Sequence, residues 1–268
     1  MFSICMATMN AADTLERAIS SILMQDTDDY EIVISDGNSI DGTLDILQKY
    51  REKINLVSES DSGIADAWNK AIKRTRGKWL YFLGADDVLA TDQVLSSAAK
   101  RLKDMHGLVA YGDVNYVNTA GREVCRSAVE WDADAFRRSG MTFSHQGVFH
   151  HRDLFELYGL FSTNFSIAID YELLLRYLLN NDAIHFMNFT VAHAQISGLS
   201  SKSINMLRVM HENRLAQRKH GIHGNSATFY RALAGALVKN GIIRLFGETR
   251  GERLIEVCRP LVRRPRRD

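Results

Sequence analysis

The sequence predicts an α/β fold in which a Rossmann-like, mainly parallel sheet carries helices on both faces. Short apolar runs rich in aromatic and β-branched residues recur through the first 110 residues, as in buried strands. Each run is followed by a segment whose apolar residues are three and four positions apart, as on one face of a helix. Such repeated alternation favours parallel strands joined by crossover helices.

The first half of the chain shows this alternation most clearly. The segment after the first strand places Leu15, Ala18, Ile19 and Ile22 on one helix face. The predicted strands are residues 2–8, 31–35, 54–58, 79–83 and 108–112, and the predicted helices are residues 12–25, 41–51, 63–75 and 91–103.

The alternation loosens after residue 111. A turn at residues 118–121 separates two strand-like segments and predicts a hairpin. The predicted strands are residues 114–117, 122–126 and 184–192, and the predicted helices are residues 131–138, 152–158, 170–179, 204–220, 226–240 and 250–258.

Composition excludes several classes of protein. The formal net charge of +1 gives no basic field for nucleic acid. Cys5, Cys125 and Cys258 are widely spaced, which is typical of reduced cytoplasmic thiols and not of a disulfide framework or a zinc site. The apolar N-terminus lacks a basic region and predicts a buried strand, and no apolar run approaches the roughly 20 residues of a membrane span.

Two adjacent carboxylates follow the predicted strand 79–83. Asp86 and Asp87 would lie at the carboxyl edge of the sheet, where open α/β folds bind ligands. Paired carboxylates there attract a hard divalent cation, which is usually shared with a phosphate. The alternative is a turn that leads into a helix N-cap, since Asp favours both.

Polar residues follow the other predicted strands as well. Thr8, Asn10 and Asp36 would lie on the same edge as Asp86, and Asp36 could accept a hydrogen bond from a ligand. An isolated Asp-Gly turn is the alternative for Asp36. After the third strand, Asp61 is a candidate N-cap, and Asn69 lies on the helix side that carries Asp66; a capped, solvated helix is the alternative there.

Together these motifs resemble those of family 2 glycosyltransferases, which have the GT-A fold. The resemblance covers roughly residues 1–200, and the motifs occur in family order. They are Thr8-Met9-Asn10, Ser35-Asp36-Gly37, Asp41-Gly42-Thr43, the segment 61–70, Gly84-Ala85-Asp86-Asp87, Ser144-His145-Gln146-Gly147 and the segment 170–176.

The resemblance implies a role for each motif. Donor-binding residues would be Thr8, Asn10, Asp36, Asp61, Asn69, Ala85 and Asp86. Asp86 would hold Mg²⁺ or Mn²⁺ on the diphosphate. Gly84 stands where the first Asp of the family's D-x-D motif is usual, so Asp87 is the candidate second metal ligand. Asp170 would be the general base, and His145 and Gln146 would line the acceptor side. His193 and residues 195–200 resemble the loop that closes over the site.

The resemblance also implies a reaction. We expect an inverting transfer of a sugar from a nucleotide-diphosphate donor, of the UDP type, to a hydroxyl of a glycan or lipid-linked acceptor. A sugar nucleotidyltransferase is one alternative, although Asn10-Ala11-Ala12-Asp13 offers no glycine-rich, basic phosphate loop. A non-catalytic sugar- or protein-binding module is the other. A dehydrogenase is disfavoured, because no G-x-G-x-x-G follows the first strand.

Three parts of the chain then receive functions. Residues 1–110 would bind the nucleotide-sugar, residues 111–200 the acceptor, and residues 201–268 would form a helical extension. From Arg244 onward, eight arginines stand against four acidic residues beside an apolar segment. This pattern is typical either of a solvated tail or of a helix on an anionic membrane surface. We therefore expect a cytoplasmic protein that can lie peripherally on the membrane's inner face.

Overall fold

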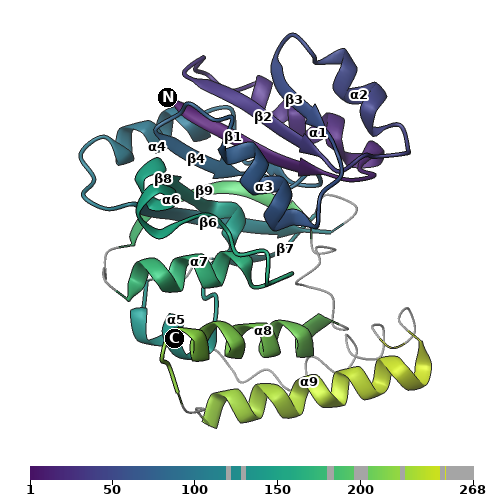
Figure 1. Ribbon diagram of the computed structural model, residues 1–268, viewed down its shortest axis with the longest axis vertical. Helices are drawn as coiled ribbons and strands as arrows, with labels where there is room; N and C mark the ends of the chain where they lie inside the picture. Colours follow the sequence, from purple (N-terminus) through teal and green to yellow (C-terminus); the bar gives the residue numbers. More distant parts are fainter. Residues whose placement is uncertain are drawn as a thin grey trace.

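A computed structural model describes residues 1–118, 122–127, 131–179, 184–195, 205–223, 227–247 and residue 251. The sheet and its covering helices form one end of the molecule, and two long helices, α8 and α9, lie side by side at the other (Figure 1). Between them lies α7, which contacts α8.

Nine strands of the described residues form one mixed, mostly parallel sheet. Its order is β3-β2-β1-β4-β8-β6-β9-β5, with β7 paired to β6 outside this path. The strands are β1 (Phe2–Thr8), β2 (Tyr30–Asp36), β3 (Ile54–Ser58), β4 (Trp79–Phe82), β5 (Val88–Leu89), β6 (Val109–Val117), β7 (Glu123–Ser127), β8 (Val148–His151) and β9 (His185–Gln195).

The first four strands in chain order are parallel, as predicted, and their register aligns their carboxyl ends. Thr8 pairs with Asp36 across β1 and β2, and Asp36 pairs with Ser58 across β2 and β3. β6 is parallel to β9, whereas β8 runs antiparallel to both β4 and β6. Because the carboxyl ends of parallel strands meet at one edge, the polar residues that follow them come together there.

Helices cover both faces of the sheet. The helices of the described residues are α1 (Ala12–Leu23), α2 (Thr43–Lys49), α3 (Ile64–Ile72), α4 (Val94–Leu102), α5 (Ala133–Ser139), α6 (Arg152–Tyr158), α7 (Ile169–Leu178), α8 (Met206–Lys219) and α9 (Ala227–Phe246). Of these, α8 and α9 lie away from the sheet (Figure 1). A 3₁₀ turn, η1, spans His145–Gly147.

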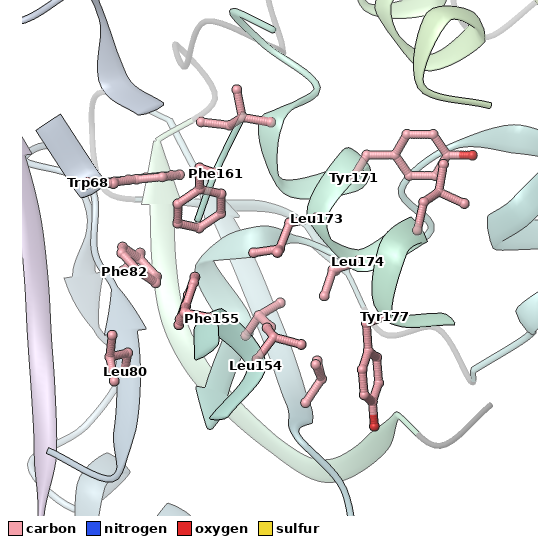
Figure 2. Close-up of a cluster of buried hydrophobic side chains, with 14 of the residues drawn as sticks. Trp68, Leu80, Phe82, Leu154, Phe155, Phe161, Tyr171, Leu173, Leu174 and Tyr177 are labelled. Carbon is pink, nitrogen blue, oxygen red and sulfur yellow. The ribbon is translucent and has the colours of Figure 1, made fainter. Parts of the chain in front are cut away.

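Alternate residues of β4 divide the apolar core in two. Trp79 and Tyr81 pack with α1 and α4, whereas Leu80 and Phe82 pack with α3, α6 and α7. Figure 2 shows the second cluster, in which Trp68 of α3 and Phe161 face Phe82. Successive strand side chains point to opposite faces, so four residues of β4 anchor helices on both sides.

The element predictions hold closely in the first half. Every predicted strand and helix up to residue 112 is present, with ends that differ by a few residues. The hairpin is confirmed as β6 and β7. The predicted strands 108–112 and 114–117 are a single strand, β6, because pairing with β9 resumes at Asp113, opposite Thr190, after an irregularity in register at Gly112. The predicted helix 250–258 lies almost wholly outside the described residues.

Two strands were not predicted. β5 has two residues, too few for any periodicity, and β8 contains two histidines that interrupt its apolar pattern. The two C-terminal helices agree with prediction, although α9 extends to Phe246. Within the described ranges, none of the helices combines the length and apolarity that crossing a membrane requires.

We predict that Leu174→Ala destabilises the protein by about 2–5 kcal/mol, the usual cost of a cavity at a fully buried leucine. Leu174 is a residue of α7, and its side chain lies in the core cluster of Figure 2. Urea unfolding followed by circular dichroism measures the loss. The matched control is Leu157→Ala at a 71% exposed position of α6, which should change stability by less than about 0.5 kcal/mol. Equal losses in both variants would contradict the described core.

Candidate active site

The carboxyl edge of β1, β2 and β3 carries a buried carboxylate, Asp36. Its Oδ1 accepts hydrogen bonds from Thr8 Oγ1 (2.9 Å) and Ser39 Oγ (2.6 Å). Its Oδ2 accepts from the Ser39 amide (3.0 Å) and Ser58 Oγ (2.7 Å). Burial alone would raise the pKa of Asp36, but the hydrogen bonds from Ser39, Ser58 and Thr8 outweigh burial and lower it. Asp36 is therefore ionised and ties the ends of three strands together.

Asn10 joins the loop after β1 to the loop after β2. Its side chain accepts a hydrogen bond from the Ile40 amide (2.9 Å), and its own amide donates to Ser39 Oγ (2.9 Å). Asn10 has a φ of 50°, in the left-handed region that Asn tolerates better than most residues. Thr8, Asn10 and Asp36 are thus brought together, as the sequence predicted for the donor side.

Asp61 approaches this edge from the loop after β3. Its Oδ1 accepts from the Gly63 amide (2.8 Å), and its Oδ2 lies close to Gly37. A Cβ placed on Gly37 would lie 2.6 Å from that oxygen, so a side chain at position 37 would displace the Asp61 carboxylate.

Asn69 has a different environment from the other predicted donor residues. It is buried on α3, and its amide group both donates to and accepts from the backbone of Phe161 (2.8 and 3.0 Å). This pair ties α3 to the segment that leads into α7. Asn69 therefore links α3 to the segment before α7.

Asp86 and Asp87 converge over Gly84. A Cβ on Gly84 would lie 2.5 Å from Asp87 Oδ2 and 3.0 Å from Asp86 Oδ1. Asp86 is partly exposed, and the neighbouring Ala85 lies in the same turn. The missing side chain at position 84 is thus what leaves room for the Asp87 carboxylate.

Asp87 is almost fully buried and accepts a hydrogen bond from the Gln195 amide (3.1 Å). Burial, together with the charge of Asp86, raises the pKa of Asp87 to about 7, although hydrogen bonds from Gln195 and Gln146 oppose the shift. Two carboxylates that repel each other in this way fit a divalent cation, because its charge would remove the repulsion. No three potential ligands of the His, Cys, Asp and Glu types gather anywhere in the described ranges, so phosphate or water oxygens would have to complete the coordination.

Asp170 lies in the first turn of α7, near enough to His145 for the two side chains to interact electrostatically. Burial raises the pKa of Asp170, and the hydrogen bond that its Oδ1 accepts from the Tyr171 amide (2.7 Å) opposes this shift. His145 stacks on Trp68, with ring centroids 4.9 Å apart, and its Nε2 is buried with no hydrogen-bond partner. Burial lowers the pKa of His145, so its imidazole is neutral near pH 7. A carboxylate with a raised pKa beside a neutral imidazole is suited to accepting a proton.

A hydrogen-bond chain that the sequence did not predict lies between these two carboxylate sites. Tyr116 Oη donates to Ser144 Oγ (3.0 Å), and Ser144 Oγ donates to Gln146 Oε1 (2.5 Å). The Gln146 side chain in turn interacts with Asp87. Burial raises the pKa of Tyr116, and the charges of Asp87 and Asp170 add to this shift.

His145 and Gln146 are consecutive, and they face different partners. His145 faces Asp170, whereas Gln146 faces Asp87, and the Gln146 carbonyl accepts from Tyr81 Oη (2.5 Å). The two predicted acceptor-side residues therefore join the metal candidates to the base candidate. Of the predicted closing loop, residues 196–200 lie outside the described residues.

The chain is similar to known glycosyltransferases. The family model "Glycosyl transferase family 2" matches residues 3–154, more than half of the chain. A PGL/p-HBAD biosynthesis glycosyltransferase of Mycobacterium bovis is 32% identical over 208 residues, which cover 75% of this chain and 79% of that protein.

Solved structures show the same fold at lower sequence identity. S. aureus TarS 1–349 in complex with UDP-GlcNAc has a TM-score of 0.62 and 22% identity, over 80% of this chain and 66% of that one. The mannosyltransferase PcManGT from Pyrobaculum calidifontis, in complex with GDP-Man and Mn²⁺, has a TM-score of 0.61 and 18% identity, over 97% of this chain and 79% of that one.

The fold is therefore that of the GT-A glycosyltransferases. The family match and the mycobacterial relative show further that the chain belongs to glycosyltransferase family 2 and is a glycosyltransferase.

We predict that Gly84→Ala weakens donor binding by at least about tenfold, because the new methyl group would displace the Asp87 and Asp86 carboxylates. Calorimetric titration with a nucleoside diphosphate and Mn²⁺ measures the effect. Gly235→Ala is the control, since a Cβ there meets no atom within 4 Å. Wild-type affinity in Gly84→Ala would show that the carboxylates do not depend on this gap.

Proposed function

We propose that the protein transfers a sugar, with inversion, from a UDP-sugar to a hydroxyl of a glycan or lipid-linked acceptor. The observation that carries this proposal is that one short segment, Ser144–Gln146, interacts with both carboxylate sites: with Asp170 through His145, and with Asp87 through Gln146. This arrangement offers a base for the acceptor and a charged site for the donor's diphosphate at one edge of the sheet.

The donor would lie along the ends of β1, β2 and β4. Thr8, Asn10, Asp36 and Asp61 surround the place for base and ribose, and Ala85 and Asp86 lie beside the place for the diphosphate. Both oxygens of Asp36 already accept hydrogen bonds from other residues of the protein. We therefore assign Asp36 chiefly to shaping this pocket. We choose UDP as the nucleotide because TarS, which has the same fold, was solved in complex with UDP-GlcNAc. GDP is the alternative, because PcManGT was solved with GDP-Man.

In the proposed reaction, Asp170 removes the proton of the acceptor hydroxyl as its oxygen attacks the anomeric carbon. The bond from that carbon to the diphosphate oxygen breaks on the opposite face, so the configuration inverts. Mg²⁺ or Mn²⁺, held by Asp86 with Asp87, would supply positive charge to the departing diphosphate. His145 and Gln146 would orient the acceptor, which lowers the entropic part of the barrier.

A lipid-linked acceptor is supported by the C-terminal helices. From Ala227 to Gly247 the chain has three basic residues and no acidic one, and Leu237, Val238 and Leu245 are exposed. A cavity of about 310 Å³ between α8 and α9 is lined by apolar residues and by arginines, among them Phe229, Leu233 and Arg218. We therefore assign donor binding to residues 1–110, acceptor binding to residues 111–200, and contact with an anionic membrane face in the cytoplasm to residues 201–268.

We predict that Asp170→Asn lowers kcat by at least about 100-fold, because the amide cannot accept the proton. UDP affinity should stay within about twofold, since donor binding does not use this side chain. Release of UDP in the presence of acceptor measures kcat, and calorimetry measures affinity. Full retained activity would contradict the assignment of the base.

The pH dependence gives an independent check on the same residue. Asp170 must be ionised to act, and burial raises its pKa. The rate of the wild type should therefore fall as pH decreases through a value above the ordinary Asp pKa of about 3.9. The residual rate of Asp170→Asn should not show this fall at low pH.

We predict that nucleoside diphosphates raise the thermal midpoint of the protein in the order UDP above GDP, and only with Mn²⁺ or Mg²⁺ present. Asp86→Ala should abolish the metal-dependent part of the shift while leaving the ligand-free midpoint within a few degrees. An equal shift in EDTA would contradict the metal site. Pyrophosphate release from a nucleoside triphosphate would instead favour a nucleotidyltransferase, and binding without any transfer or donor hydrolysis would favour a non-catalytic module.

A further inference from the structure

A carboxylate on the C-terminal extension contacts the segment that leads into α7. Glu212 of α8 is only 6% exposed. Its Oε2 accepts hydrogen bonds from three consecutive backbone amides, those of Ser166 (3.0 Å), Ile167 (2.8 Å) and Ala168 (3.0 Å). These residues immediately precede the helix that carries Asp170.

The N-terminus of α7 needs such a partner. The first amides of a helix have no acceptor within the helix, and the N-cap residue Ala168 has no side chain that could accept a hydrogen bond. A negative charge near a helix N-terminus also interacts favourably with the helix dipole. Among the three amides bound by Glu212, that of the N-cap residue Ala168 belongs to the helix terminus. Glu212 therefore satisfies one terminal amide from another helix and places its charge at the start of α7.

The orientation of Glu212 is itself fixed by Arg208, one turn earlier on α8. Arg208 Nε donates to Glu212 Oε1 (3.1 Å), and Arg208 Nη2 donates to Ser166 Oγ (2.7 Å). Each carboxylate oxygen therefore has its own partners, and the two residues hold the segment 166–168 from two sides. Hydrogen bonds to a charged group are stronger than neutral ones.

We propose that Glu212 is a positioning residue for catalysis: by anchoring residues 166–168, it fixes the first turn of α7 and so the Asp170 carboxylate opposite His145. This proposal rests on the proposed function of Asp170. It gives the C-terminal extension a part in the transfer reaction beyond contact with a membrane. Glu212 acts through the backbone and needs no contact with substrate.

The same helix provides a matched control. Lys219 of α8 donates to the buried Glu172 of α7 (2.8 Å), and His220 lies 3.1 Å from the same oxygen. Lys219 therefore joins α8 to α7 without touching residues 166–168. A purely structural role for α8 would make Glu212 and Lys219 equivalent in their effect on catalysis.

The test compares Glu212→Gln with Lys219→Ala in the full chain. Glutamine keeps the size of the side chain but lacks the charge, and its amide group would face either Arg208 or the backbone amides. We expect Glu212→Gln to lower kcat about 10- to 100-fold, as misplacement by an ångström can, with donor KM and UDP affinity within about twofold. Lys219→Ala should keep kcat within about twofold of the wild-type value, even if its thermal midpoint falls as far as that of Glu212→Gln.

A second measurement does not depend on activity. Hydrogen exchange should show slow exchange of the 166–168 amides in the wild type and in Lys219→Ala, and faster exchange in Glu212→Gln. Rapid exchange in the wild type, or kcat losses in the two variants that simply follow their losses of stability, would overturn the proposal. Failure of the proposed function is distinguishable, because Asp170→Asn would then retain activity whatever Glu212→Gln does.

Discussion

The contacts of three consecutive residues, Ser144 to Gln146, hold the site together. Ser144 binds Tyr116, His145 faces Asp170, and Gln146 faces Asp87. The stacking of His145 on Trp68 fixes this segment against α3, so it is tied to both halves of the sheet domain. Displacement of the segment would change the surroundings of both carboxylate sites at once. The relation between the proposed donor and acceptor sides therefore depends on a short loop and not on a hinge between domains.

Three aspartates at this edge have different pKa shifts because their environments differ, and each environment suits a different role. Asp36 is buried but receives four hydrogen bonds, which hold its pKa below the ordinary value. Asp87 is buried beside a like charge, which raises its pKa to about 7. Asp170 is raised mainly by burial, with a neutral imidazole beside it. The first is suited to structure, the second to a cation, and the third to accepting a proton.

The sequence revealed the edge but not the contacts across it. Thr8, Asp36 and Asp86 could be placed together because strand–helix alternation defines where parallel strands end. The hydrogen bonds of Asp36 could not, since Ser39 comes from the loop after β2 and Ser58 from the end of β3. Nothing in the sequence pattern around Tyr116 or Glu212 marks them, because their importance comes from partners 28 and at least 44 residues away. The glycine at position 84 looked like a lost ligand, whereas the fold uses its small size to admit Asp87.

The reversed strand β8 explains how the segment 144–146 reaches this edge at all. A parallel strand delivers to the carboxyl edge the residues that follow it, but an antiparallel strand delivers those that precede it. Tyr81 of β4 pairs with Phe149 of β8, so the start of β8 lies beside the end of β4. Phe149 and His150 point to opposite cores, and a slip of one residue would exchange them and move the segment by about 3.3 Å. The spacing between the two proposed chemical groups is thus set by sheet register.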